Sequence, residues 1–404
     1  MIWGFQCMSK RLIRADGQSC FTTASAPPHL NKETRKSLIS VLHVVLSTVT
    51  GGMENVIYNL ATGFDKSRFK LSVGCLVELG HLSDRLREFD IESEVVPGMI
   101  PGLSLIYPGQ LIKFIRQSGC DIVHTHSGCW AKVAAACAFI RKVKLIYTEH
   151  GRTFPEPKVN ILQDRISARF TNRIVAVGDP LNRYLIDRVG LHPEKVVTIR
   201  NGIDTERFKS SDERESVRRE FGFTDNDVVI VIVARLAPVK NHSFLIDTFH
   251  TVSSIFPQAR LLIIGDGPLR SQLENQAVSL KLTDKVVFTG DRHDVPRLLA
   301  AADIATLCSH SEGISLTLLE AMSSQLAAVA TDVGGNPDIV THGENGYIVK
   351  LNDKSDYADK LSKLIHSGDL REKFGIKARN EVVASWSLKG MVDAYQRLYQ
   401  ELAG

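Results

Sequence analysis

The sequence predicts an α/β protein built from two doubly wound parallel sheets, and three observations lead to this prediction. Short apolar runs alternate with amphipathic stretches from Leu38 onward, as strands and helices do in repeated βαβ units. The series of runs stops near residues 201–227 and then begins again, which indicates two sheets. Several runs are followed by glycine, histidine or charged residues, at the position where open α/β sheets bind their ligands.

The predicted strands fall into two series. The first series comprises residues 40–47, 70–77, 120–126, 144–150, 173–178 and 196–202. The second comprises residues 228–236, 259–265, 285–290, 303–309, 327–333 and 346–350. We therefore predict an N-terminal Rossmann-like domain over 37–205 and a C-terminal one over 206–385, facing each other across a cleft. A helical pattern within 386–404 ends the chain.

The bulk composition is typical of a globular protein with sizeable cores. Of the 404 residues, 44% are hydrophobic and 23% are charged. The seven cysteines are scattered without a CxxC pair, so we interpret them as reduced thiols in a cytoplasmic setting. No uninterrupted apolar run approaches the ~20 residues of a membrane span.

Charge is distributed unevenly along the chain. Residues 1–36 and 37–205 each carry an excess of four basic residues, and 206–404 carry an excess of four acidic ones. A basic first half allows peripheral contact with an anionic membrane surface, although ordinary scatter of surface charge explains it equally well. Residues 1–36 lack a periodic pattern, so we expect a disordered tail or a start codon assigned too early, rather than an organelle transit peptide.

Two strand ends carry residues suited to a diphosphate. Gly51 and Gly52 follow the first run, where a backbone can approach a phosphate at a helix N-terminus; most such turns are only turns. Arg235 and Lys240 follow the first run of the second series, and two fixed cations suit a diphosphate leaving group. An arbitrary pair of this kind is more often solvated surface charge.

The segment 261–274 resembles a dinucleotide fingerprint only in part. Gly265 and Gly267 have the right spacing, but Arg270 stands in place of the third glycine, which argues against an NAD-binding domain. The Gly-Asp-Gly-Pro turn can still lie close to a ligand and start a helix at Pro268.

The most specific segment is 309–322. Glu312 follows a predicted strand, Ser315 is a candidate N-cap, and Glu320 falls in the next helix. The free backbone amides between the two carboxylates would form an anion site. These amides belong to Gly313, Ile314, Ser315 and Leu316. A carboxylate accepts two hydroxyl hydrogen bonds, which suits a ribose diol or a sugar.

Histidines end two strands of the first series. His150 ends one run and is predicted to point into the cleft; a structural histidine is the alternative. His124 and His126 end another, and without a third ligand at a suitable spacing we predict acceptor-side lining or a structural role and no metal. The acidic triplet 225–227 imitates a metal-binding Asp-x-Asp motif, but its place before a strand favours a turn.

These motifs together resemble glycosyltransferase family 4, the large retaining group with the GT-B fold. The resemblance covers residues 38–404. It rests on GGMENV (51–56), TEHG (148–151), NGID (201–204), ARLAPVKN (234–241), GDGP (265–268), SEG with LLEAM (311–322) and ATDVGGNPDIV (330–340).

The resemblance implies a role for each candidate residue. Arg235 and Lys240 would bind the donor diphosphate, and Glu320 would hold the ribose hydroxyls. Glu312 and the backbone from Gly313 would contact the sugar and phosphate, with Gly51 and Gly52 closing over the diphosphate. His150 would orient the donor sugar and stabilise charge in the transition state, and the terminal helix would pack on the first domain. Gln325 and Ala327 replace the family's usual glycine and proline, and Asp338 stands where glutamate is common.

The predicted function is transfer of a hexose from a UDP- or GDP-linked donor to a glycan or lipid-linked acceptor, in cell-surface polysaccharide synthesis. The motifs supply no carboxylate nucleophile, so we expect the family's front-face route with retention and without a metal or other cofactor. A nucleotide-sugar epimerase or hydrolase of the same fold is the alternative. A dehydrogenase and a non-catalytic sugar-nucleotide sensor are less favoured, and no nucleic-acid partner is expected.

Overall fold

The protein is described here from a computed structural model covering residues 38–49, 52–98, 108–152, 156–210 and 212–404. Residues 38–404 form one compact unit. The predicted N-terminal tail and Gly51 lie outside the described residues.

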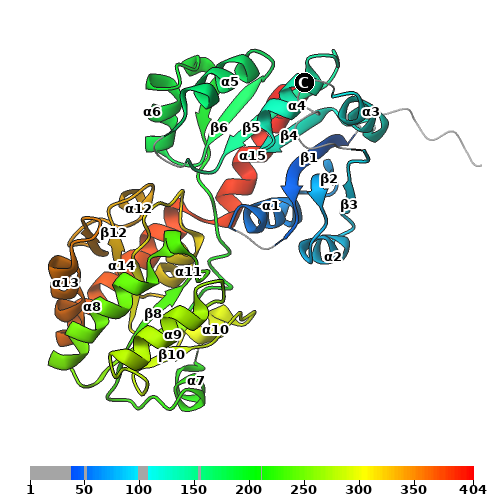
Figure 1. Cartoon of the computed structure of the whole chain (residues 1–404). Helices are drawn as coiled ribbons and strands as arrows, with labels where there is room; N and C mark the ends of the chain where they lie inside the picture. Colours follow the sequence, from blue (N-terminus) through cyan, green and yellow to red (C-terminus); the bar gives the residue numbers. More distant parts are fainter. Residues whose placement is uncertain (1–37, 50–51, 99–107, 153–155, 211) are drawn as a thin grey trace, which may run out of the picture. The chain divides into compact units, whose positions relative to one another are not determined.

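The first half of the unit contains a parallel sheet of seven strands. Their order is β3-β2-β1-β4-β5-β6-β7 (Figure 1). The strands are β1 (Ile39–Ser47), β2 (Phe69–Glu78), β3 (Glu92–Val95), β4 (Ile122–His126), β5 (Lys144–Glu149), β6 (Arg173–Ala176) and β7 (Val196–Thr198). The helices between them are α1 (Gly52–Gly63), α2 (Leu82–Arg87), α3 (Gly109–Ser118), α4 (Trp130–Cys137), α5 (Lys158–Arg169), α6 (Asp179–Asp187) and the 3-10 turn η2 (Pro193–Lys195).

The second half contains a parallel sheet of six strands. Their order is β10-β9-β8-β11-β12-β13. The strands are β8 (Val228–Val233), β9 (Ala259–Ile264), β10 (Val286–Phe288), β11 (Ile304–Leu307), β12 (Ala327–Thr331) and β13 (Gly346–Val349). The helices are α7 (Arg214–Glu220), η3 (Pro238–Lys240), α8 (His242–Ile255), α9 (Arg270–Ser279), α10 (Val295–Leu299), α11 (Leu316–Ser323), α12 (Asn336–Ile339), α13 (Lys354–His366), α14 (Gly368–Ser385) and α15 (Leu388–Ala403).

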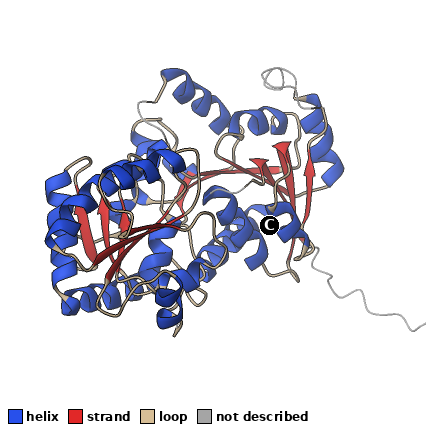
Figure 2. Ribbon diagram, turned by 60° about the horizontal axis from the view of Figure 1, so that its bottom comes forward, coloured by secondary structure: helices blue, strands red, loops and turns tan. Residues whose placement is uncertain are grey.

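Both faces of each sheet are covered by helices, with the strands lying between them (Figure 2). Side chains alternate between the two faces of a strand. In β1, Val41 and Val45 pack in one apolar cluster with α1 and α15, while Leu42 and Val44 pack in another with α3 and α4. Burial on both sides explains why these strands read as continuous apolar runs in the sequence.

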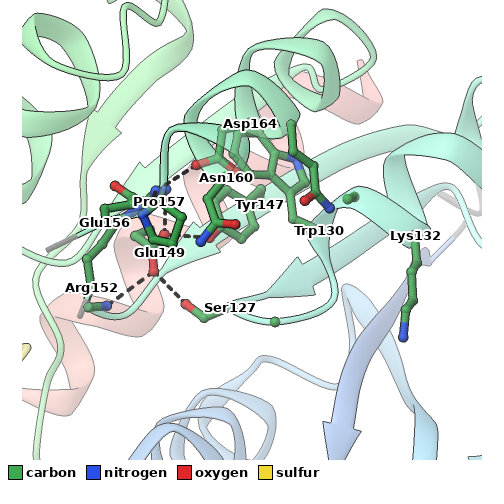
Figure 3. A pocket seen from close by; sticks show the side chains of 14 residues that line it. Ser127, Trp130, Lys132, Tyr147, Glu149, Arg152, Glu156, Pro157, Asn160 and Asp164 are labelled. Atoms are coloured by element: carbon green, nitrogen blue, oxygen red, sulfur yellow. Dashed lines mark hydrogen bonds and ion pairs between the residues drawn. The ribbon is translucent and has the colours of Figure 1, made fainter. Parts of the chain in front are cut away.

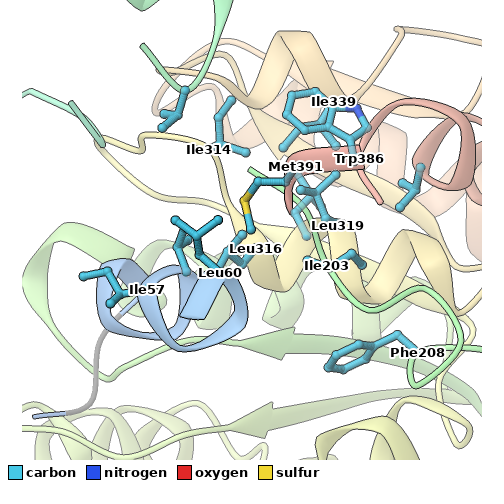
Figure 4. Packing of buried hydrophobic residues seen from close by; sticks show 14 of the residues in the cluster. Ile57, Leu60, Ile203, Phe208, Ile314, Leu316, Leu319, Ile339, Trp386 and Met391 are labelled. Carbon is cyan, nitrogen blue, oxygen red and sulfur yellow. The ribbon is translucent and has the colours of Figure 1, made fainter. Parts of the chain in front are cut away.

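The chain passes between the two sheets twice, and the two passages are hydrogen-bonded to each other. Ile203 forms a parallel bridge with Ser387; its N–H donates to the Trp386 carbonyl at 2.9 Å, and its carbonyl accepts from Leu388 at 2.7 Å. Apolar side chains of both passages, including Ile203, Trp386 and Met391, share one buried cluster (Figure 4). After the second passage, α15 contacts α1 and β1 of the first sheet.

The predicted strands agree closely with the observed ones. One strand and the start of one helix differ from the prediction. β3 was not predicted because its sequence, ESEV, carries two charged residues and lacks an apolar run. The helix expected at Pro268 begins at Arg270, since Leu269 is its N-cap. None of the helices in the described part of the chain is long and apolar enough to cross a membrane.

Candidate functional site

The order of strands in both sheets identifies where a ligand site is expected. In each sheet the chain winds outward from a central strand in one direction and then in the other. The reversal falls between β1 and β4 in the first sheet, and between β8 and β11 in the second. Loops that follow these strands diverge at this point and leave a crevice for a ligand.

Two predicted site residues meet beyond β8 and β11. Lys240, at the end of η3, places its Nζ 2.6 Å from Oε1 of Glu312, which lies in the loop after β11. The Ser309 hydroxyl donates to the same oxygen at 2.5 Å. The Arg235 side chain is exposed, and its guanidinium makes no hydrogen bond or ion pair with other described residues. One cation is therefore held in place and the other is free to meet an anion.

The helix after Glu312 begins as the sequence predicted. Ser315 is the N-cap of α11, and its hydroxyl accepts a hydrogen bond from the Leu318 N–H at 3.3 Å. Gly313 has no room for a side chain, because an added Cβ would lie 2.1 Å from the carbonyl oxygen of His150. The backbone amides at the start of α11 thus lie beside the end of β5.

Glu320 lies one turn further along α11. Burial raises its pKa to about 8, and the opposing attraction of Arg207 is weaker. The carboxyl therefore holds a proton at neutral pH in the empty protein. Hydroxyl donors from a ligand would favour its ionised form.

Gly265 and Gly267 are required by the protein's own backbone. An added Cβ would lie 2.2 Å from the Ala234 carbonyl oxygen at Gly265, and 2.6 Å from the Leu236 carbonyl oxygen at Gly267. The turn after β9 therefore packs tightly on the segment that carries Arg235. Gly52 is the first residue of α1.

Four histidine rings gather on one face of the first sheet, three of them buried and the fourth, His150, half-buried. His43 of β1 pairs in register with His124 of β4, so both point to the face covered by α1 and α15. His126, two residues further on, points the same way, and His150 follows β5. His43 Nδ1 lies 3.1 Å from His126 Nε2, and His126 Nδ1 lies 3.0 Å from His150 Nε2. These three rings form a continuous hydrogen-bonded row.

His124 belongs to a different hydrogen-bonded group. Its Nδ1 lies 2.6 Å from the hydroxyl of Tyr399 on α15, and its Nε2 lies 2.7 Å from Oγ1 of Thr148. His124 and His126 are almost completely buried, and neither lines the cavity described below.

The structure brings a third imidazole, a possible metal ligand, close to His124 and His126, which the sequence did not indicate. His43, from a strand far upstream, brings its ligand atom within 4.8 Å of theirs. Both nitrogens of His124 are already hydrogen-bonded, and His43 is bonded to His126. A metal ion would have to replace these bonds, so the arrangement present is a hydrogen-bond network.

Burial also keeps these rings neutral. It lowers the pKa of His43 and of His150 to about 4, and those of His124 and His126 well below their ordinary value. At neutral pH His150 can donate or accept a hydrogen bond, but it carries no charge.

A cavity of about 540 Å³ lies on the opposite face of the same sheet, at the ends of β4 and β5 (Figure 3). Tyr147 and Glu149 alternate with Thr148 and His150 along β5 and therefore point to this side. The Trp130 ring stacks on Tyr147 with centroids 4.0 Å apart. Residues of α5, including Asn160 and Gln163, complete the wall.

One guanidinium and three carboxylates dominate the chemistry of this cavity. Arg152 pairs with Glu149 at 2.8 Å, with Asp164 at 2.6 Å and with Glu156. Burial raises the pKa of Asp164 to about 6, against the attraction of Arg152. Ser127 links this group of charged side chains to His150. Its hydroxyl donates to Glu149 at 2.7 Å and accepts from the backbone N–H of His150 at 2.9 Å.

This cavity was not predicted from the sequence, although Glu149 and Arg152 stand beside the predicted His150. The position of Glu149 at the end of a strand could have indicated it, because ligand-binding residues of α/β sheets gather at strand ends. The acidic triplet, by contrast, forms the expected turn. Asp227 accepts hydrogen bonds from the N–H and hydroxyl of Thr224, and it pairs with Arg260 at 2.8 Å.

Comparisons with known proteins cover both sheets. Residues 50–207 match the model of Glycosyltransferase Family 4, and residues 213–381 match that of Glycosyl transferases group 1.

Two curated proteins illustrate the similarity in sequence. The chain is 26% identical over 383 residues to a UDP-Gal:alpha-D-GlcNAc-diphosphoundecaprenol alpha-1,3-galactosyltransferase of Escherichia coli, covering 91% of this chain and 98% of that protein. It is 30% identical over 302 residues to the putative glycosyltransferase EpsD of Bacillus subtilis (strain 168), covering 71% and 79%.

A solved structure illustrates the similarity in fold. HepE of Anabaena, crystallised in complex with UDP and glucose, matches with a TM-score of 0.79 at 23% identity, over 90% of this chain and 100% of that one. The predicted GT-B fold is thereby confirmed.

Proposed function

Because the chain belongs to glycosyltransferase family 4, with the group 1 model over its second sheet, we propose that it transfers a hexose from a nucleotide-diphosphate sugar with retention of configuration. The observation that supports this proposal most directly is the 2.6 Å pair of Lys240 and Glu312. The pair stands where the strand order reverses, beside the N-terminus of α11. Cations and free amides together suit a diphosphate.

In the proposed donor complex the diphosphate lies between Arg235, Lys240 and the amides at the start of α11. These groups balance the negative charge that grows on the leaving diphosphate, and because the protein fixes them in advance they need little reorganisation. Glu320 accepts hydrogen bonds from the ribose hydroxyls. The pairing of Lys240 with Glu312 keeps the ammonium group in one position before the donor arrives.

The reaction proposed here takes the front-face route. Double displacement needs a free carboxylate beside the anomeric carbon. Glu312 is already engaged by Lys240 and Ser309, so it is poorly placed to attack carbon. The acceptor hydroxyl enters on the face that the diphosphate leaves, and a phosphate oxygen takes the hydroxyl proton. Neutral His150 contributes a hydrogen bond to the donor sugar.

The cavity beside Glu149 is the proposed site for the saccharide part of the acceptor. Carboxylates and amides such as those of Glu149 and Asn160 bind sugar hydroxyls. Three carboxylates outnumber Arg152, and both terminal nitrogens of its guanidinium pair with them. An uncharged sugar therefore fits this cavity better than a phosphate, and the diphosphate of a lipid-linked acceptor would lie outside it.

The proposed setting is cell-surface polysaccharide synthesis in the cytoplasm, at the membrane surface. The E. coli relative is named for transfer of galactose from UDP-galactose to a lipid-linked GlcNAc diphosphate. We therefore place UDP-hexoses first among donors and GDP-mannose second.

The test begins with the donor. Thermal unfolding is measured with UDP, UDP-glucose, UDP-galactose and GDP-mannose, since a ligand that binds the native state raises the melting temperature. The best donor is then incubated with a short-chain GlcNAc-diphosphate lipid, and the anomeric configuration of the product is read by NMR. We expect transfer with retention.

Three outcomes would contradict the proposal. An inverted product rules out retention. Consumption of donor without acceptor favours an epimerase or a hydrolase of the same fold. Binding of donor without any turnover, across a panel of saccharide acceptors, would point to a sensor.

A further inference from the structure

The outer face of α5 carries an exposed apolar stripe. Val159, Leu162, Ile166 and Phe170 are 67%, 59%, 50% and 47% exposed. Their spacing of three and four residues places them in one row along the helix and just beyond its end. Scattered exposed apolar residues are ordinary, but a row of four large ones is not.

Basic side chains run along one edge of this stripe. Lys158, Arg165 and Arg169 are exposed and fall beside the apolar row at helical spacing. Arg165 Nε donates to the Val189 carbonyl at 2.6 Å, so this guanidinium is held in place by the protein. The inner face of α5 is different, since Ser167 and Ala168 are buried against the sheet. An apolar row bordered by cations is the pattern of a helix that lies in the interface of an anionic bilayer.

The same helix lines the proposed acceptor cavity. Asn160 and Asp164 face the cavity (Figure 3), and Gln163 also lines it, while Leu162 and Ile166 are exposed on the outer side. A bilayer against the outer stripe would therefore lie next to the cavity that receives the acceptor sugar. We propose that α5 docks the protein on an anionic lipid surface through Val159, Leu162, Ile166 and Phe170, with Lys158, Arg165 and Arg169 contacting lipid phosphates. This docking extends the proposed function but does not depend on it.

The test uses the full chain and vesicles that contain no sugar lipid. Co-sedimentation is measured with vesicles of phosphatidylcholine alone and of phosphatidylcholine with phosphatidylglycerol, at low and high salt. We expect binding to the anionic vesicles that weakens with salt. The double variant L162S/I166S should weaken binding by about tenfold or more, as expected from the lost apolar area. Val278→Ser, which changes an equally exposed residue on α9, is the matched control and should bind like the wild type.

Some results would overturn this proposal. The proposal fails if the protein does not bind vesicles, or if it binds neutral vesicles as well as anionic ones. It also fails if the double variant binds like the wild type while its melting temperature is unchanged. A dimer that the double variant abolishes, without vesicle binding, would assign the stripe to contact between two copies of the chain. Because no donor or acceptor is present, failure of the glycosyl transfer proposal would leave this measurement unaffected.

A second inference rests on the row of His43, His126 and His150. Each ring has one proton, and each ring nitrogen between neighbours either donates or accepts, so the three tautomers are coupled. Either all three rings carry the proton on Nδ1, or all three carry it on Nε2. The nitrogens left over at the two ends are His43 Nε2 and His150 Nδ1, which have no hydrogen-bond partner among the described residues.

The two ends of the row differ in their surroundings. His43 lies mid-strand and is fully buried, whereas the His150 ring follows the end of β5 and is partly exposed, although its Nδ1 atom is buried like His43 Nε2. In the Nε2–H arrangement the unpaired N–H belongs to His43 and is enclosed by the sheet; in the Nδ1–H arrangement it belongs to His150, where the proposed contact with the donor would accept it. We infer that His43 and His126 are positioning residues that fix His150 as the Nδ1–H tautomer, so that it donates to the ligand. This inference rests on the proposed role of His150.

The first test reads the tautomers directly. NMR of the full chain with ¹⁵N-labelled histidine distinguishes protonated from unprotonated ring nitrogens, and the signals are assigned with single histidine variants. We expect Nδ1–H at all three rings. The Nε2–H tautomer at His150 would overturn the inference. This readout needs no turnover, so it stands or falls separately from the proposed activity.

The second test breaks the row at its far end. His43→Phe removes the donor to His126, and we expect mixed tautomers at His150 with kcat lowered about tenfold, the equivalent of one hydrogen bond, and a smaller change in the donor KM. His43→Asn can still donate and should restore part of the rate. Tyr399→Phe removes a buried hydroxyl from the neighbouring His124 group and is the control. Equal loss of kcat in the Phe variants of His43 and Tyr399 would indicate a merely structural role.

Discussion

Lys240 Nζ and Glu312 Oε1 lie 2.6 Å apart, so an ion pair stands in the proposed donor site. The two residues come from loops after neighbouring strands, and each is more than half shielded from solvent. The ammonium group is thereby fixed, and the carboxylate is kept ionised and engaged. A diphosphate entering this site meets a cation whose position is already set.

Replacing Lys240 with alanine is therefore expected to lower kcat by roughly 100-fold, the loss typical of removing one group that stabilises a leaving anion. The circular dichroism spectrum should be unchanged. Lys373→Ala, which changes an exposed lysine on α14, is the control and should retain activity. A folded Lys240→Ala protein with near-normal turnover would exclude Lys240 from the donor site.

The pKa of Glu320 makes stability depend on pH. Burial raises this pKa to about 8, so the folded protein holds a proton that the unfolded chain releases at a lower pH. The stability associated with this proton is complete below the ordinary carboxyl pKa and is lost as pH rises toward about 8. Glu320→Gln should raise the melting temperature at pH values above neutrality, with little change in acid.

The same carboxyl couples donor binding to proton release. Hydroxyl donors favour the ionised form, so UDP affinity should increase as pH rises toward the pKa of Glu320. Titration calorimetry in buffers of different ionisation enthalpy measures the protons released. The Gln variant should bind UDP weakly and without this pH dependence; an unchanged dependence would assign it to another group.

Gln325 adopts a left-handed backbone conformation with φ of 63°. This conformation costs a side-chain-bearing residue roughly 1–2 kcal/mol and costs glycine little. Gln325→Gly should therefore stabilise the protein by about 1 kcal/mol, partly offset by the greater freedom of glycine in the unfolded chain. Chemical denaturation measures the change, and Gln258→Gly serves as a control at a position outside that conformation. Destabilisation at Gln325 would contradict this account.

Arg152 balances three carboxylates in the proposed acceptor cavity. Removing one partner of a buried ionic group leaves unpaired charge and costs about 3–5 kcal/mol. Arg152→Met should therefore lower stability strongly at neutral pH and less in acid, where Asp164 takes up a proton. Arg87→Met, at an exposed ion pair, should change little. Equal losses of unfolding free energy at both positions, measured by urea unfolding, would show that the ion pairs of Arg152 stabilise the protein no more than an exposed pair does.

The front-face route proposed for this enzyme uses no metal ion. Dialysis against EDTA should therefore leave the transfer rate unchanged, and added Mg²⁺ or Mn²⁺ should not raise it. Loss of activity that Zn²⁺ restores would direct attention to His43, His124 and His126, whose ligand atoms lie within 4.8 Å of one another.

That Lys240 and Glu312 lie close together was easier to predict from the sequence than the histidine cluster of the first sheet. Lys240 and Glu312 stand directly after strands, and a parallel sheet brings such positions to one edge. His43 lies inside a strand, and its proximity to His124 depends on β1 and β4 being neighbours, which the order of runs along the chain does not reveal. The cavity proposed for the acceptor combines residues of β5 and α5, and the orientation of their side chains depends on how the helix packs on the sheet.

The stacking of Tyr399 on Phe64, with ring centroids 5.3 Å apart, has a consequence for how the protein is made. The first sheet is synthesised early, but part of its core is covered by α15, which is synthesised after the whole second sheet. An apolar face of the nascent N-terminal half therefore stays uncovered until α15 has been made. For the same reason a single cut between the two sheets cannot release an intact N-terminal half. A separately expressed version would need residues 386–404 supplied as a fused or added peptide.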